Sequence, residues 1–192
     1  MLQLSNILIK TLAELLSMLY AQVRNDIETT MQGAFLNRYM KDLIKGKTIP
    51  AKKENIVNSL SDFNEVYLGM HGKPGFLIDQ NRHRITADEL GCLSGKRIYG
   101  FTCFSNSVGR NTNADMWMGF NDEFFFPVSI NAEKFFWAGF KPLKMLQEGK
   151  SAKEIESTAN KCFDTVIADI LRSGDTFEAS LAAWNKSIFE IL

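Results

Sequence analysis

The chain has 192 residues, 45% of them hydrophobic and 23% charged, and its 22 basic and 22 acidic side chains cancel. These proportions are typical of a globular protein, and the length is enough for one domain with a substantial core. The sequence has no basic block, which argues against a protein that follows the phosphate backbone of a nucleic acid. Nucleic acid is therefore not an expected partner.

The apolar N-terminus does not have the pattern of a membrane span or an export signal. Lys10 and Glu14 interrupt it, and it has neither a basic lead nor a small-residue cleavage site. The cysteines Cys92, Cys103 and Cys162 lack C-x-x-C spacing, so we expect no disulfide framework and no zinc site. A histidine-rich metal centre is not expected from two histidines. These features predict a cytoplasmic protein without membrane association, cofactor or metal.

Residues 6–45 are predicted to be helical almost throughout. Apolar residues recur there at spacings of three and four, as on a helix with one buried stripe. Gly33 is the predicted break between two helices, Gly46 ends the second, and Pro50 is predicted to open a further short helix. We interpret this segment as a helical layer that covers a sheet, with a partner-binding or lipid-surface arm as the alternative.

The centre of the chain has two short apolar runs that are typical of strands. The first, Glu65–Met70, is followed by His71, and the second begins at Lys96 and ends at Cys103. In an open α/β sheet, the carboxyl ends of the strands are where chemistry is placed. His71 and Cys103 are therefore expected to meet in space despite their separation in the sequence.

The segments around these strands complete the predicted sheet. Phe76–Ile78 and His83–Ile85 are predicted to form a small hairpin, and Thr86–Glu89 has the T-x-x-E form of a capping box at a helix start. The polar stretch 105–113 is expected to be a loop. Asp115–Phe120 and 123–128 are predicted as two further strands, or as one strand with a bend.

Helices are predicted over the rest of the chain. Ala132–Gln147 is the first, a second capping box at Ser151–Glu154 starts the next, and Ser173–Asp175 separates it from a last helix that runs to the end. The pattern predicts an α/β fold, a three-layer sandwich with a mainly parallel sheet and helical N-terminal and C-terminal segments. We interpret the chain as one domain, with a helical N-terminal layer, catalytic strands and loops, and C-terminal helices over residues 1–60, 61–130 and 131–192.

His71, Gly72 and Cys103 have the residue types that nucleophilic catalysis needs. A thiol with an ordinary pKa of about 8.5 is mostly protonated at neutral pH, so a nearby imidazole has to take its proton. Gly72 leaves room for a substrate carbonyl close to the backbone N–H groups that would stabilise an oxyanion. In the alternative interpretation both side chains are structural, because cysteine is often buried and a lone histidine often binds a turn.

The other candidates are weaker. We interpret Cys92 and Cys162 as structural and expect Cys103 to be the most reactive thiol, because only Cys103 has a proposed base. His83 is the weaker candidate base, since it lies between two arginines in a solvated setting. Asn121 and Asp122 are candidate substrate-pocket residues; the Asp122 carboxylate would recognise a basic side chain or cap the turn, and we favour the turn.

Several short motifs resemble those of the caspase-like cysteine peptidases (clan CD), and most of all those of bacterial CHAT-type and gingipain-like domains. In those domains a histidine–glycine strand end is followed by a helix and by a strand that ends in a small residue and a cysteine. The likeness covers about residues 65–160. The motifs are His71-Gly72-x-Pro74-Gly75, Gly95-Lys96-x-Ile98, Cys103 with Ser105 close behind, Met118-Gly119-Phe120 and Leu146-x-x-Gly149-Lys150-Ser151.

This resemblance implies a thiol protease, a hydrolase that cleaves protein or peptide substrates. It implies that His71 is the general base and Cys103 the nucleophile, with backbone N–H groups near Gly72 and Cys103 for the oxyanion and no metal in the chemistry. A catalytically inactive binding or regulatory module with the same fold is the alternative. The oligomeric state is left open.

Overall fold

The computed structural model describes residues 18–40 and 46–192. Six strands form one sheet in the order β2-β1-β3-β7-β8-β9, in which β9 is antiparallel to β8 and the other pairs are parallel. The predicted α/β class with a mainly parallel sheet is confirmed. The strands are β1 (Met18–Gln22), β2 (Gly46–Pro50), β3 (Glu65–Gly69), β7 (Arg97–Gly100), β8 (Met116–Phe120) and β9 (Phe189–Ile191).

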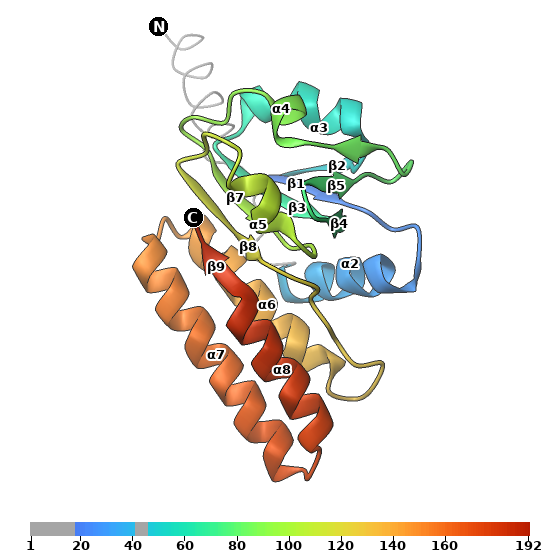
Figure 1. Cartoon of the computed structure of the whole chain (residues 1–192), viewed down its shortest axis with the longest axis vertical. Coiled ribbons are helices and arrows are strands. Elements are labelled where there is room, and N and C mark those ends of the chain that lie inside the picture. Colours follow the sequence, from blue (N-terminus) through green and yellow to red (C-terminus); the bar gives the residue numbers. More distant parts are fainter. Residues whose placement is uncertain (1–17, 41–45) are drawn as a thin grey trace, which may run out of the picture.

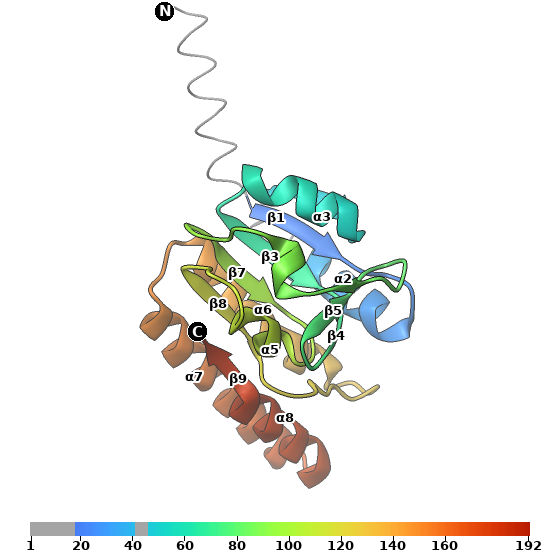
Figure 2. The same cartoon turned by 45° about the horizontal axis from the view of Figure 1, so that its top comes forward.

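Helices cover both faces of the sheet (Figure 1). Three short helices pack on one face, and α2 and α6 pack on the other, where α7 and α8 form a long hairpin outside α6 (Figure 2). This is a sandwich of helices around a sheet, as predicted. The helices are α2 (Ile27–Met40), α3 (Lys53–Ser59), α4 (Ala87–Leu90), α5 (Ser105–Gly109), α6 (Ala132–Gln147), α7 (Ala152–Arg172) and α8 (Thr176–Ile188).

The central strands are buried on both faces, as is usual for parallel strands covered by helices. Successive side chains point to opposite faces, so Leu19 and Val66 lie in the core under α3, whereas the tyrosines face α6. Tyr20, Tyr67 and Tyr99 are in register on neighbouring strands, with ring centroids 6.0 and 6.1 Å apart. This row of aromatic rings crosses the middle of the sheet and fixes the register of its three central strands.

The prediction of helix over 6–45 is wrong at Met18–Gln22, which form β1 in the interior of the sheet. All five residues are buried. A continuous apolar run satisfies helical spacing as well as strand spacing, so periodicity cannot separate the two. The predicted break at Gly33 is also wrong, because α2 continues through it. Residues 6–17 and 41–45 of the predicted helical segment lie outside the described part of the chain.

The segment around Pro50 also differs from the prediction. Gly46 begins β2 and Pro50 ends it, so Pro50 does not open a helix, and α3 starts at Lys53. β2 is at the edge of the sheet, where a proline is tolerated because its missing N–H is not needed by a neighbouring strand.

Most of the later elements are confirmed, with three corrections. The hairpin is part of a separate antiparallel sheet of β4 (His71–Lys73), β5 (Phe76–Ile78) and β6 (Arg84–Ile85), and both capping boxes are present. The predicted loop at 105–113 begins with the helix α5. The predicted strand at 123–128 does not form, and the last helix ends at Ile188 and continues as β9.

Among the described residues, no helix combines the length and the apolar character that crossing a membrane requires.

Candidate active site

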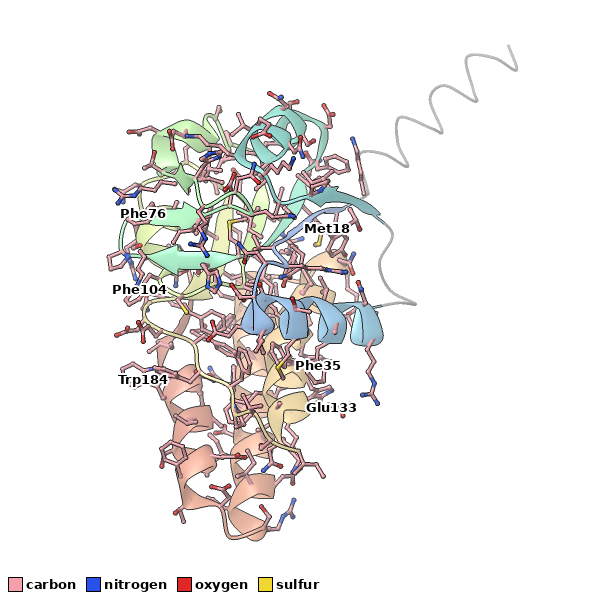
Figure 3. All side chains as sticks on the ribbon, turned by 90° about the vertical axis from the view of Figure 1, so that its right-hand side faces the viewer. Met18, Phe35, Phe76, Phe104, Glu133 and Trp184 are labelled. Carbon is pink, nitrogen blue, oxygen red and sulfur yellow. The ribbon has the colours of Figure 1, made fainter. Side chains whose placement is uncertain are left out.

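Cys103 lies on a tight turn between β7 and α5. The next residue, Phe104, has a left-handed backbone with φ of 54°, a conformation that costs a bulky residue about 1–3 kcal/mol and occurs mostly where function or tight packing demands it. Figure 3 shows Phe104 between the hairpin that carries Phe76 and the helix that carries Trp184. The turn therefore presents the thiol at the carboxyl end of the sheet, where it was expected.

Ser105 fastens this turn to two strands. Its hydroxyl donates to the Gly100 carbonyl at 2.8 Å and accepts from the Phe120 N–H at 3.0 Å. Neither Gly100 nor Gly119 has space for a side chain, because a Cβ atom would lie 2.7 and 2.0 Å from the Ser105 side chain. The ends of β7 and β8 thus hold the cysteine turn rigidly.

His71 approaches the same place from the hairpin. It is the first residue of β4, directly beyond β3. In the turn between β4 and β5, the Gly75 N–H donates to the Ser107 hydroxyl at 2.8 Å, and this bond docks the β4–β5 hairpin on α5. A Cβ atom on Gly72 would lie 1.8 Å from the Cys103 carbonyl oxygen. Gly72 is therefore needed for a close backbone approach, but the group that approaches it in the free protein is the cysteine turn and not the substrate carbonyl of the prediction.

Asp26 binds the His71 ring. Asp26 follows β1 and caps α2, since its Oδ1 accepts from the Thr29 N–H at 2.9 Å, and its Oδ2 lies 2.5 Å from His71 Nε2. Burial raises the pKa of Asp26, but hydrogen bonds from the Thr29 N–H, from His71 and from the Thr29 hydroxyl outweigh it and hold that pKa below its ordinary value. The carboxylate is therefore ionised, and Nε2 must carry the proton that it donates.

This pair leaves Nδ1 of His71 as the nitrogen that can accept a proton. A carboxylate that fixes one ring nitrogen also sets the tautomer and the orientation of the ring. Sequence reasoning missed Asp26 because it lay inside the predicted helix. The polar pair Asn25-Asp26 soon after the apolar run Met18–Ala21 was the available signal, since aspartate is a preferred helix cap.

Buried amides hold the Asp26 helix against the cysteine turn. Gln32 on α2 donates to the Phe101 carbonyl at 2.6 Å and accepts from Gln22 at 3.0 Å. Gln22 in turn accepts from the Tyr67 hydroxyl at 3.0 Å. The network joins β1, β3, α2 and the end of β7, so the elements that carry Asp26, His71 and Cys103 are fixed to one another.

The environment of Cys103 favours the neutral thiol. Burial raises the pKa of Cys103, and the negative charges of Glu123 and Glu28 raise it further, although the Phe124 N–H, 3.4 Å from Sγ, acts in the other direction. His71 and Cys103, both in the described part of the chain, form no hydrogen bond with each other. In this arrangement the protonated thiol is therefore the favoured form of Cys103.

His71 and Cys103 line one cavity of about 420 Å³. Five of its lining residues are phenylalanines, and the segment that follows β8 supplies three consecutive ones, 124–126. Asn185 on α8 holds this segment by accepting from the Phe125 N–H at 2.9 Å and donating to its carbonyl at 2.5 Å. The backbone at Phe125, which was predicted to be part of a strand, is thus bonded by a side-chain amide and not by a neighbouring strand.

Asn121 and Asp122 are not among the described residues that line this cavity. Asn121 binds the side chains of Arg110 and Glu190 at 3.1 and 3.0 Å. The Asp122 carboxylate accepts from the Glu123 N–H at 2.8 Å, which is the turn interpretation favoured above. The acidic side chains on the cavity wall are Glu123 and Glu28, neither of which was a candidate from the sequence.

The remaining candidates lie elsewhere. Cys162 is buried on α7, where burial raises its pKa, whereas Cys92 is exposed and its pKa is lowered by hydrogen bonds from Asn113 and Ser94. Cys92 thus has a greater tendency to ionise than Cys103, the thiol that was expected to be the most reactive. His83 lies 3.3 Å from Asp79, away from the cavity.

Among the described residues, two groups of side chains have the donor atoms of a metal site: Asp26, Glu28 and His71, and Glu54, Asp79 and His83. In each group the ligand atoms lie within 4.8 Å of one another.

No protein-family model matches the sequence, and neither the curated proteins nor the solved structures give a significant match.

Proposed function

We propose that the chain is a caspase-like cysteine peptidase in which Asp26, His71 and Cys103 act as one unit. The observation that carries the proposal is their placement: the three residues follow β1, β3 and β7, which are adjacent parallel strands. Asp26 contacts the ring of His71, and His71 and Cys103 share a cavity. An acid, a base and a nucleophile from adjacent strand ends are the arrangement expected of covalent acyl transfer.

The chemistry follows from the tautomer of His71. Nδ1 takes the proton from the Cys103 thiol as the sulfur attacks the carbonyl carbon of the scissile bond, while Asp26 stabilises the imidazolium. The carbon–sulfur bond forms, and the carbonyl oxygen becomes an oxyanion that backbone N–H groups near Gly72 and Cys103 would bind. The imidazolium then protonates the leaving amine, and water hydrolyses the thioester.

The cavity favours a basic side chain next to the scissile bond. The carboxylates of Glu28 and Glu123 both act on Cys103, and neither takes part in an ion pair among the described residues. Lys73 is the one lysine among the described residues that line the cavity, so the two carboxylates outnumber it. The aliphatic stem of a bound lysine or arginine would lie along the aromatic walls, with its charge at the carboxylates.

A binding or regulatory module is the second candidate, and the state of Cys103 favours it. The raised pKa of Cys103 and the missing hydrogen bond to His71 describe a thiol that is not activated in the free protein. Catalytic hydrogen bonds are often long before the substrate binds, so the same state is consistent with a peptidase that its substrate activates. The cytoplasm is the proposed compartment, in line with three cysteines that form no disulfide.

The test is cleavage of a peptide library that presents each side chain before the scissile bond. We expect wild type and Cys92→Ala to cleave after lysine or arginine and Cys103→Ala to be inactive. An acyl probe with a basic side chain should label Cys103. Failure of wild type both to cleave and to be labelled would contradict the peptidase and favour the binding module.

A further inference from the structure

We propose that Asp26, Glu28 and His71 form a zinc site that switches off the base of the candidate active site. Their ligand atoms, two carboxylate oxygens and one imidazole nitrogen, lie within 4.8 Å of one another. Zinc binds both imidazole nitrogen and carboxylate oxygen, and its catalytic sites have three protein ligands and an open fourth position. Two carboxylates and a neutral imidazole would also balance the charge of a divalent cation.

The geometry needs only small movements. Tetrahedral zinc with bonds of about 2.0–2.1 Å holds its ligand atoms roughly 3.3 Å apart, whereas Asp26 Oδ2 and His71 Nε2 are now 2.5 Å apart, joined by the proton on Nε2. The cation would replace that proton while the two groups separate. Both side chains are about one-third exposed, at 39% and 34%, so they have room to do so.

The surroundings support a ligand here. Thr29 already holds Asp26 Oδ1 through its N–H and its hydroxyl at 2.9 and 2.8 Å, an arrangement like the outer-shell contacts that orient metal-binding carboxylates. Thr102 is 96% buried, yet within the described structure its hydroxyl has no hydrogen-bond partner. Thr102 lines the same cavity as Glu28 and His71. Its hydroxyl is closed to solvent in the free protein and would have to rotate to reach a water on the open position of the metal.

The second group, Glu54, Asp79 and His83, has the same donor types but is already occupied. Asp79 is fully buried, and its two oxygens accept from the N–H groups of Lys53, Asn81 and His83. A cation would have to displace those bonds. By contrast, the Glu28 carboxylate forms no hydrogen bond or ion pair with any described residue. The structure thus offers a matched control with the same chemistry.

Zinc at this site would block catalysis through the tautomer of His71. The free ring donates from Nε2 to Asp26 and can accept at Nδ1. When zinc takes the Nε2 lone pair, the proton of the neutral ring is on Nδ1, so that nitrogen can no longer accept the thiol proton. This consequence rests on the proposed peptidase, whereas the binding of zinc does not.

Binding is tested by calorimetric titration of the full chain with Zn²⁺, in a Cys92→Ser background so that the exposed thiol does not compete. We expect one zinc per chain. Glu28→Gln should weaken binding by at least about 10- to 100-fold, the range that loss of even an outer-shell residue produces, and Thr29→Val by about 10-fold. Glu54→Gln and Cys103→Ser should not change it. Because Glu28 forms no hydrogen bond or ion pair with the residues that the structure describes, its substitution should leave the fold intact.

Co²⁺ substitution checks the ligands directly, since a site of nitrogen and oxygen donors gives d–d absorption without a thiolate charge-transfer band. Absence of binding, equal affinity in Glu28→Gln, a loss of affinity in Glu54→Gln, or a thiolate band would each overturn the site. If peptidase activity is found, zinc should inhibit it and chelation should restore it. With each rate expressed as a fraction of the same variant's metal-free rate, the zinc concentration that inhibits Glu28→Gln should be at least tenfold higher than that for wild type. Tight binding without inhibition would overturn the proposed switch and leave the site.

Discussion

The chain has two aspartate–histidine pairs, which use the same groups in different ways. Asp79 is fully buried, and three backbone N–H groups, those of Lys53, Asn81 and His83, bind its oxygens at 2.7–2.9 Å. Asp26 caps one helix and gives its second oxygen to His71 beside a cavity that contains a thiol. The difference shows that residue type alone does not decide the role of an aspartate–histidine pair. The role depends on which other groups the carboxylate binds.

The largest expected effect separates the two histidines by activity. His71→Ala should lower kcat/KM by about 10²–10⁴-fold, the usual contribution of general acid–base catalysis. His83→Ala should change it less than about twofold, because His83 lies outside the cavity. The measurement is steady-state cleavage of the best library peptide. Similar losses of kcat/KM in both variants would contradict the assignment of different roles to the two histidines.

The next effect separates the two aspartates by stability. Asp79→Asn should lower the free energy of unfolding by about 2 kcal/mol, because hydrogen bonds to a buried charged acceptor are lost and an amide N–H₂ faces backbone donors. Asp26→Asn should cost less than about 0.5 kcal/mol, since asparagine caps helices as well as aspartate does. Urea unfolding of both variants measures the difference, and equal losses would contradict it.

A smaller effect concerns the thiols. Iodoacetamide should alkylate Cys92 about tenfold faster than Cys103 in the free protein, because Cys92 is exposed and its pKa is lowered, whereas burial raises the pKa of Cys103. Cys162, buried on α7, should react last. Mass spectrometry of a time course gives the order. If Cys103 reacted first, it would be activated without substrate, and the account of its resting state would be wrong.

The smallest effect is the pH dependence of stability. Burial raises the pKa of Asp79, but hydrogen bonds from the Lys53, His83 and Asn81 N–H groups outweigh it, so the folded pKa is below the ordinary value of 3.8. The stabilisation is therefore complete above that ordinary value and is lost as the pH falls through the folded pKa. The stability gap between wild type and Asp79→Asn should narrow from pH 6 to pH 2.5 in urea unfolding. A gap that widened would contradict the assignment.

The sequence is sufficient to predict the elements with distinctive local chemistry. The capping boxes at Thr86 and Ser151 and the strands before His71 and Cys103 are where they were expected. In each case, the local sequence pattern, a capping box or an apolar strand, favours the same structure as the packing of the element in the fold.

The missed parts depend on contacts between residues far apart in the sequence. β1 is apolar from Met18 to Ala21, so its pattern fits a helix as well as a strand. Because β1 was assigned to a helix, Asp26, the exposed acid that follows it, was missed as well. The extended segment at Phe125 is held by Asn185, which is distant in the chain. Asp26 and Glu123 are components of the site only because the fold brings them to His71 and Cys103, and neither position has a local signature of catalysis.

The central claim, that Asp26, His71 and Cys103 work as one unit, is tested most directly by kcat/KM of Asp26→Asn. This variant keeps the helix cap but offers His71 an amide in place of a carboxylate, so the tautomer is no longer fixed. The account predicts a loss of at least about 100-fold with unfolding free energy nearly unchanged, and no further loss when Asp26→Asn is added to His71→Ala. Full activity of Asp26→Asn, or losses that multiply in the double variant, would contradict it.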